Sequence, residues 1–211
     1  MSRFDLSLLR RRLGVVLLAA AIALGFAHGS SAAATDEAQA AVQRLVEEII
    51  KILSTDELDT QQEIEQLGQV IDREADLDIL GRLSLGRHWR DFSEVQQEEY
   101  RELFRRLMLR KFAGYLNAYA GQDLGPTAEL FQIAGSQELS GDDILVETRI
   151  TPAEKPPLRV GWRVRERDSR ALVIDVIVGE ASLLITQRSE FGAVIGQRGV
   201  DGFLDDLRGR V

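Results

Sequence analysis

Two residues of the chain have the chemistry and the setting for acid–base catalysis. Asp175 lies in the middle of the apolar segment 171–178, and a carboxylate buried in such a segment must be paired or have a raised pKa, which would suit proton transfer. His88 lies among arginines in Arg87-His88-Trp89-Arg90 and could act as a general base. A structural role is the alternative for each, and we favour it. His88 would be a packing or surface residue, and Asp175 would form an ion pair that joins the sheet to the last helices, with Arg163, Arg165 or Arg188 as candidate partners.

The composition excludes several other kinds of chemistry. With no cysteine among 211 residues, the chain cannot form a disulfide, a thiolate nucleophile, a zinc finger or an iron–sulfur centre. The sequence contains no G-x-S-x-G, P-loop, dinucleotide-binding or H-E-x-x-H motif. Its net charge of −8, from 34 acidic and 26 basic residues, argues against nucleic-acid binding, which requires clustered cations. We therefore expect no catalytic residue, no metal site and no cofactor.

Residues 1–34 have the form of a cleaved secretory signal peptide. Four arginines precede an apolar run from Leu13 to Phe26, and the small residues Ser30-Ser31-Ala32-Ala33-Ala34 follow it. The apolar run is too short to span a bilayer comfortably, and no cysteine follows it to carry a lipid anchor. We expect cleavage after Ala34, a single domain at residues 35–211, and no stable insertion in a membrane.

The first half of the predicted domain is helical. Apolar residues recur every three or four positions over residues 36–53, which predicts a helix with one buried stripe. Capping-box patterns at Thr60–Glu63 and Ser93–Gln96 predict the starts of two more helices, the second of which is long and ends at Gly121. A short helix is expected at residues 77–85 between them.

The second half is rich in strands and ends in helix. After Gly125-Pro126 the apolar period becomes two, over residues 130–133, 144–150 and 158–164, and residues 171–178 are apolar at nearly every position. Short connections at 155–157 and 168–170 predict an antiparallel meander. A last helical region at residues 182–208 is expected to break near Gly196 to Gly199. This order predicts an α+β fold in which helices pack on one face of a four-stranded antiparallel sheet.

Several segments together resemble one protein family. They are Leu85-Gly86-Arg87-His88-Trp89-Arg90, the stretch from Asp175 to Leu183, Arg188-Ser189-Glu190-Phe191 and the tail from Gly199 to Leu204. In this order they are similar to MlaC, the periplasmic phospholipid-binding family that serves the Mla (toluene-tolerance) ABC transport system. The segment 171–175 departs from the family pattern because it has no aromatic residue, and Thr186-Gln187 replaces an Asn-Tyr pair.

The resemblance implies a fold, a cargo and partners. The fold would be a cone like that of nuclear transport factors, with a curved sheet and an apolar cavity for acyl chains. The protein would be a soluble periplasmic carrier that shuttles diacyl phospholipid, as cargo rather than cofactor, in maintenance of outer-membrane lipid asymmetry. Its partners would be the inner-membrane Mla ABC transporter complex and the outer-membrane lipoprotein–porin complex. Two alternatives stay open: a small isomerase or cyclase on the same fold that uses Asp175 or His88, and a carrier of another apolar ligand such as a sterol, a quinone or a lipoprotein acyl chain.

The candidate lipid-binding residues are apolar positions of the sheet and of the long helix. Trp162, Val160 and Val164 share one strand parity, opposite Arg163 and Arg165, and should point toward the helices. A solid core built from the same residues is the alternative. Arg87, Arg90 and Arg188 are candidate docking or headgroup residues. The full set of candidate cavity residues is Leu103, Leu107, Tyr115, Val146, Thr148, Val160, Trp162, Val164, Ile174 and Val176.

Overall fold

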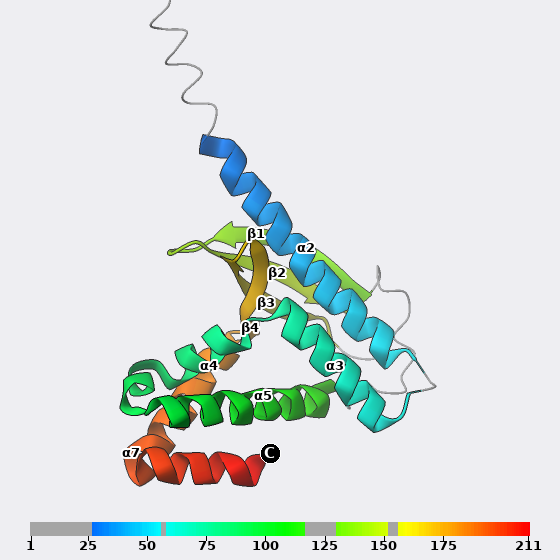
Figure 1. Ribbon diagram of the computed structural model, residues 1–211. Coiled ribbons are helices and arrows are strands. Elements are labelled where there is room, and N and C mark those ends of the chain that lie inside the picture. Colours follow the sequence, from blue (N-terminus) through cyan, green and yellow to red (C-terminus); the bar gives the residue numbers. More distant parts are fainter. Residues whose placement is uncertain (1–26, 56–57, 117–129, 152–155) are drawn as a thin grey trace, which may run out of the picture.

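Helices come first along the chain, an antiparallel sheet follows them, and a long helix ends it (Figure 1). A computed structural model describes residues 27–55, 58–116, 130–151 and 156–211. The helices before the sheet are α2 (Ala27–Leu53), α3 (Thr60–Glu74), α4 (Leu77–Leu85) and α5 (Glu94–Leu116), with the 3₁₀ helix η1 (Gly86–Asp91) between the last two. The strands are β1 (Phe131–Glu138), β2 (Asp143–Ile150), β3 (Leu158–Arg167), β4 (Arg170–Val178) and β5 (Ala181–Ser182), and α7 (Leu183–Arg210) ends the chain.

Local sequence sets where the helices begin and end, with one difference from the prediction. The N-cap of α3 is Asp59 rather than Thr60, because the Asp59 carboxylate accepts the N–H of Gln62 at 2.8 Å and the Gln62 side chain accepts the N–H of Asp59 in return. The capping box of Ser93 and Gln96 at the start of α5 is confirmed. The predicted end of this long helix at Gly121 lies outside the described residues.

The sheet is an antiparallel meander in the order β1-β2-β3-β4-β5. The predicted hairpin between β3 and β4 is a two-residue turn in which Asp168 and Ser169 both have positive φ, 51° and 60°, the geometry that matches strand twist in tight hairpins. The two-residue β5 pairs with the end of β4 and adds a fifth strand to the four expected. The expected break in the last helix is also confirmed, because Gly199 in α7 has φ 69°.

The apolar residues form two buried clusters. We call the first the sheet-side cluster: it joins one face of β2, β3 and β4 to α2 and α3. We call the second the helical cluster: it joins α4, η1, α5 and α7, and it contains the aromatic rings of Tyr100, Phe104, Phe191 and Phe203. Figure 1 shows α2 running diagonally across the sheet while α5 and α7 lie side by side below it. The fold is therefore α+β as expected, with two separate layers of packing.

The helix that covers the sheet is α2, which corrects one expectation. The candidate residues Leu103 and Leu107 of α5 were expected to face the sheet, but both lie in the helical cluster. The apolar stripe of α5 carries large rings that fit against the rings of α7, whereas α2 presents the small residues Ala38 and Ala41, each 0% exposed, to the sheet. Small side chains let a helix axis approach a sheet closely, and periodicity does not reveal which of two stripes will do so.

The signal peptide that we expect at residues 1–34 stays a prediction. Residues 1–26 lie outside the described part of the chain, and α2 starts at Ala27 and continues as helix through Ala34. Cleavage after Ala34 would leave Asp36 and Glu37 in the first turn of the shortened helix, where negative charge is favourable. Within the described ranges, no helix is both long enough and apolar enough to cross a membrane.

Candidate functional site

The candidate site is the face of the sheet that α2 covers. Alternate residues of neighbouring strands face each other there in register: Val146 pairs with Trp162, and Trp162 pairs with Val176 across the next strand. Thr148 pairs with Val160 in the same way. All five side chains are at least nine-tenths buried, so this face is an apolar wall across the middle of the sheet.

The polar atoms in this wall bond to one another. The indole N–H of Trp162 donates to Thr148 Oγ1 at 2.9 Å, and the Thr148 hydroxyl donates to the Val160 carbonyl at 3.0 Å. An unpaired buried polar group would cost free energy in an apolar setting. Because these groups are paired internally, the wall presents no unpaired donor or acceptor from Thr148 or Trp162 and resembles hydrocarbon.

Half-buried apolar residues pack around the edges of the sheet-side cluster, and we call them the half-buried ring. Ile150 and Leu158 are a cross-strand pair where β2 ends and β3 begins, and Phe112 reaches the same cluster from α5. These positions are apolar but are not sealed from solvent, in contrast to the wall behind them. The half-buried residues packed on the cluster are Ala34, Ile49, Leu58, Ala75, Phe112, Ile133, Ile150, Leu158 and Leu183.

The ten predicted lipid-binding residues do not all share this site. Val146, Val160, Trp162, Val164 and Val176 belong to the sheet-side cluster, and Thr148 is hydrogen-bonded within it. Leu103 and Leu107 lie in the helical cluster, and the side chain of Tyr115 lies outside the described residues.

Ile174 differs because of a β-bulge. The pairing of β3 with β4 shifts between Arg163 and Val164, so that Arg163 opposes Asp175 while Val164 opposes Val173. Ile174 is the extra residue between them, and although it is 0% exposed it is not part of the sheet-side cluster. A bulge changes the alternation of faces along a strand, which strict parity cannot foresee.

Sequence reasoning missed residues that pack on the wall from α2, α3 and α5. Ala38, Ala41 and Val42 of α2 are fully buried against the sheet, and Phe112 is the α5 residue that reaches the sheet-side cluster. The signal available in the sequence was the run of small residues at three- and four-residue spacing after position 37. Leu67 and Val70 of α3 complete the covering layer.

Asp175 has a structural role, with partners other than those predicted. Its Oδ1 accepts the backbone N–H groups of Val176 at 2.8 Å and of Leu184 at 3.0 Å, and its Oδ2 accepts the hydroxyl of Ser182 at 2.6 Å. These three bonds join β4 to the start of α7, as the structural alternative expected. Among the described residues, no arginine bonds to this carboxylate, and Arg163 and Arg165 both bind Asp143 instead.

The ion pair at Asp143 is buried on the carboxylate side. Burial by itself raises the pKa of Asp143, but hydrogen bonds and charge from Arg165 and Arg163 outweigh it and hold the pKa below the usual 3.8. Arg165 Nε lies 2.5 Å from Asp143 Oδ1. These groups form a charge cluster where β2 begins and β3 nears its end.

The remaining candidates have structural or surface positions. Arg188 Nε donates to the carbonyl of Leu83 at 2.8 Å and so ties α7 to the end of α4. Arg87 and Arg90 are exposed. His88 Nδ1 lies 3.0 Å from Asp91 Oδ2 on the 3₁₀ helix η1, outside both buried clusters. Among the described residues, no group of three or more acidic or histidine side chains could hold a metal ion.

The protein belongs to the α+β class, with one apolar face of its antiparallel sheet covered by the separate helix α2. The comparisons identify the family: residues 43–209 match the MlaC protein family, and the chain belongs to it. The fold is also similar to a solved structure of a phospholipid-binding protein from Ralstonia solanacearum in complex with a phospholipid. That likeness has a TM-score of 0.71 and 24% sequence identity, and it covers 82% of this chain and 96% of the other.

Proposed function

We propose that this protein is a periplasmic phospholipid carrier that holds acyl chains against the face of the sheet defined by Val146, Val160 and Trp162. The single observation that carries the proposal is the apolar wall with its polar atoms paired internally. Membership of the MlaC family and the fold shared with a phospholipid-binding protein support it.

Physical chemistry explains why such a wall suffices for a carrier. At about 0.8 kcal/mol per buried methylene, two chains of about 16 carbons gain roughly 20 kcal/mol or more on leaving water. Transfer from a bilayer into a hydrocarbon-like site is close to neutral, so lipid can enter and leave again. Direction must then come from the relative affinities of the partners, because neither a P-loop nor another nucleotide-binding motif occurs in the sequence.

We also propose that the carrier travels between the two membranes of the cell envelope. The first 34 residues would direct export and be removed, and the mature protein would move between the inner-membrane Mla ABC transporter complex and the outer-membrane lipoprotein–porin complex. Cleavage would retain all of the sheet-side cluster except Ala34, which packs at its edge. The wall would therefore form in the mature protein.

We assign the opening of the site to the part of the half-buried ring where Ile150 pairs with Leu158. Ion pairs lie toward the opposite end: Arg73 binds Glu48 and Glu74, and Arg167 Nη1 lies 2.7 Å from Asp76 Oδ2. Glu74 and Asp76 are both buried, and these contacts join α3 to α2 and the start of α4 to β3. Lipid would enter where Ile150, Leu158 and Phe112 are only half-buried.

Mass spectrometry of protein purified from its native compartment tests the proposal. Native spectra should show a mass increment that disappears after solvent extraction, and the extract should contain about one diacyl phospholipid per protein. A sterol, a quinone or a single acyl chain in the extract would show a carrier of another ligand. An extract without any lipid, from protein that folds and is correctly cleaved, would favour a solid core and contradict the proposal.

A further inference from the structure

The outer face of the sheet, turned away from α2, carries a groove; Thr148 and Val160 also line it, although their side chains belong to the wall on the opposite face. Its floor is formed by Leu145, Gly161 and Ile177 from three neighbouring strands, and the groove has a volume of about 350 Å³. Gly161 sits between the other two: a Cβ built there would lie 3.1 Å from Leu145 Cδ1 and 3.4 Å from Ile177 Cβ. Because Gly161 has no side chain, the groove stays open above it, between the apolar side chains of Leu145 and Ile177.

Two arginines stand at one side of this groove. Arg149 and Arg159 are directly opposite each other in the register of β2 and β3, both are exposed, and both line the groove. Like charges in directly opposed positions destabilise a strand pair. Within the described ranges neither arginine has an ion pair with a carboxylate, whereas Arg163 and Arg165 on the same strand as Arg159 are both paired with Asp143.

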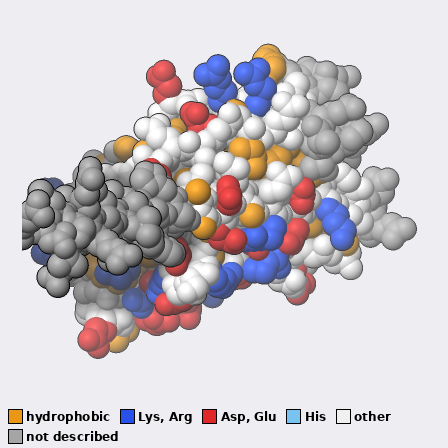
Figure 2. All heavy atoms as spheres, turned by 90° about the horizontal axis from the view of Figure 1, so that it is seen from above, with side chains coloured by type: hydrophobic (Ala, Val, Ile, Leu, Met, Phe, Trp, Pro, Cys, Tyr) orange, Lys and Arg blue, Asp and Glu red, His pale blue; other side chains and the backbone are white. Residues whose placement is uncertain are grey.

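Neither member of this opposed pair has a carboxylate partner among the described residues, whereas in the opposed pair Arg167 and Arg170 the first binds Asp76. The chain has a net charge of −8, and basic and acidic side chains are interspersed over the face shown in Figure 2. Elsewhere arginines commonly bind carboxylates, as Arg105 does with Asp72 and Arg208 with Glu99. Two exposed arginines held together therefore form a local positive site on an acidic molecule, suited to a bidentate anion.

We infer that this outer groove docks an acidic, partly apolar segment of a partner protein, with a carboxylate held between Arg149 and Arg159 and an apolar side chain on Gly161. Glu147 also lines the groove, opposite Gly161 in register, so a uniformly acidic segment would be repelled at that point. The acidic group must therefore sit at the arginine end and the apolar group beside Glu147.

A protein segment fits the charges better than a membrane surface. Recruitment by anionic lipids typically needs clusters of about four to eight cations, and this site offers two. The net negative charge of the chain would oppose approach to an anionic bilayer. The inference rests on the proposed carrier function, because a docking site on the face opposite the acyl wall would leave the wall and its half-buried ring free for transfer of cargo.

The test uses the purified full mature protein and a defined probe. The probe is a capped Asp-Val-Glu-Val peptide, and its Asn-Val-Gln-Val analogue is the uncharged control. Backbone amide chemical shifts should move for residues 145–149, 159–161 and 177 on titration of the acidic peptide, and not with the analogue. Raising the salt from about 0.05 to about 0.5 M should weaken the shifts, because exposed charges are screened.

Charge reversal identifies the residues. Arg149→Glu with Arg159→Glu should weaken peptide binding by about tenfold or more, since reversal of a charge at an interface also repels the partner. Arg87→Glu with Arg90→Glu carries the same change of charge on η1 and should have little effect; it also tests the docking role suggested for those residues. Equal losses in both variants, binding of the analogue, or no peptide binding at all would overturn the inference.

Two further measurements distinguish a failure of the docking inference from a failure of the carrier proposal. If vesicles containing phosphatidylglycerol bind in a manner that needs Arg149 and Arg159 while the peptide does not, the occupant is a membrane and the inference is wrong. The lipid content of the same preparations is measured by mass spectrometry. Wild-type protein without lipid would contradict the carrier proposal, whereas lipid-loaded protein that ignores the peptide would contradict only the docking site.

Discussion

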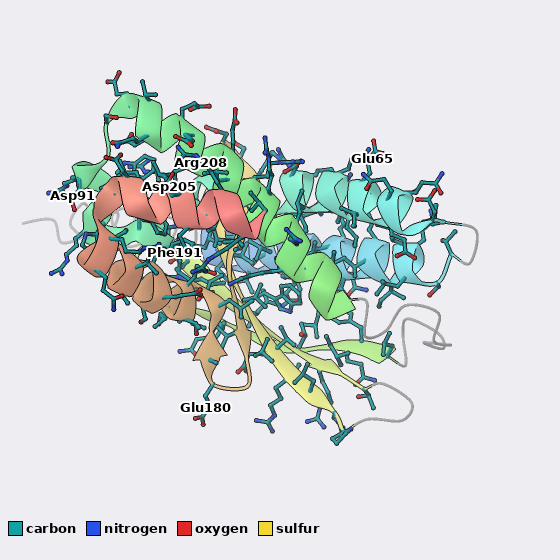
Figure 3. All side chains as sticks on the ribbon, turned by 90° about the horizontal axis from the view of Figure 1, so that it is seen from below. Glu65, Asp91, Glu180, Phe191, Asp205 and Arg208 are labelled. Atoms are coloured by element: carbon teal, nitrogen blue, oxygen red, sulfur yellow. The ribbon has the colours of Figure 1, made fainter. Side chains whose placement is uncertain are left out.

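The hydroxyl of Ser182 donates a 2.6 Å hydrogen bond to Oδ2 of Asp175, seven residues earlier in the chain. The same hydroxyl oxygen accepts the N–H of Ile185 at 3.0 Å, so Ser182 is the N-cap residue of α7. Between the two residues the chain turns at Gly179, whose φ is 63°, and Glu180 lies at the tip of the turn, away from α5 and α7 (Figure 3). The stretch from Asp175 to Leu183, one of the segments that resemble the family, is therefore a joint between the sheet and the last helix.

Replacement of Ser182 should weaken this joint. Ser182→Ala removes the cap and one bond to the Asp175 carboxylate, and it should lower the free energy of unfolding by about 1–2 kcal/mol. Ser182→Thr keeps a hydroxyl and serves as the control, with a smaller loss. Urea denaturation measures both. An unchanged midpoint for Ser182→Ala would mean that the joint does not contribute to stability.

A charge on the wall should remove lipid without unfolding the protein. Val160 is 5% exposed, lies beside the half-buried pair Ile150 and Leu158, and has its carbonyl bonded to Thr148. A glutamate there could be hydrated from the half-buried ring, so Val160→Glu should stay folded by circular dichroism and lose phospholipid in native mass spectra. Leu145→Glu places the same charge on the outer face and should keep its lipid.

The opposite result would identify a solid core. An unpaired charge buried in such a core costs several kcal/mol, from a total stability of about 5–15 kcal/mol for a typical domain. A Val160→Glu protein that unfolds at a much lower temperature, together with wild-type protein that carries no lipid, would contradict the carrier proposal.

Fluorescence should distinguish the two tryptophans. Trp162 lies in the apolar wall and is 6% exposed, while Trp89 lies between the guanidinium groups of Arg82 and Arg101, 5.5 and 5.2 Å from its ring centre. Removal of lipid by solvent extraction and refolding should change the emission of Trp162. The change should persist in Trp89→Phe and disappear in Trp162→Phe; the reverse pattern would place the ligand against the helical layer.

A side chain at Gly86 should destabilise the contact between α4 and α7. Gly86 has φ 56°, and a Cβ there would lie 3.3 Å from Nε of Arg188, the atom that donates to the Leu83 carbonyl. Gly86→Ala should therefore lower the free energy of unfolding by about 1–2 kcal/mol through backbone strain alone. Gly192→Ala, at a helical position with nothing within 4 Å of the added Cβ, is the matched control. Thermal unfolding that shows equal stability for the two variants would contradict this account.

Acid should destabilise the protein partly through Asp143. Because its pKa is held below 3.8 in the folded state by Arg165 and Arg163, the folded state is favoured while the carboxylate is ionised, above about pH 4. That stabilisation is lost as the pH falls through the lowered pKa. Urea midpoints measured between about pH 6 and pH 2.5 should fall less steeply for Asp143→Asn, which should already be less stable than wild type at pH 6. Parallel curves for the two proteins would show that Asp143 does not contribute.

Most of the helices and strands, and the faces on which they are apolar, could be predicted from local patterns in the sequence. The period of three to four at residues 36–53 and the period of two at residues 158–164 predicted α2 and β3, because both patterns depend on local geometry alone. The pairing of Ser93 with Gln96 and the turn at Asp168 and Ser169 were predictable for the same reason. Parity also placed Val160, Trp162 and Val164 on one wall, which the structure confirms.

The packing of one apolar helix stripe against the sheet, and of another against α7, depends on the tertiary structure. Periodicity shows that α2 and α5 each bury a face, but the choice of α2 for the sheet depends on fit. Ala38 and Ala41 allow close approach, while the rings of Tyr100 and Phe104 pack against Phe191 of α7. The hydrogen-bond partners of Asp175 also depend on the tertiary structure. Arginines nearby in sequence favoured an ion pair, but folding brings Ser182 and the N–H of Leu184 to that carboxylate and gives Arg163 and Arg165 to Asp143. Such contacts depend on the register of strands and on a bulge at Ile174, which only the assembled sheet establishes.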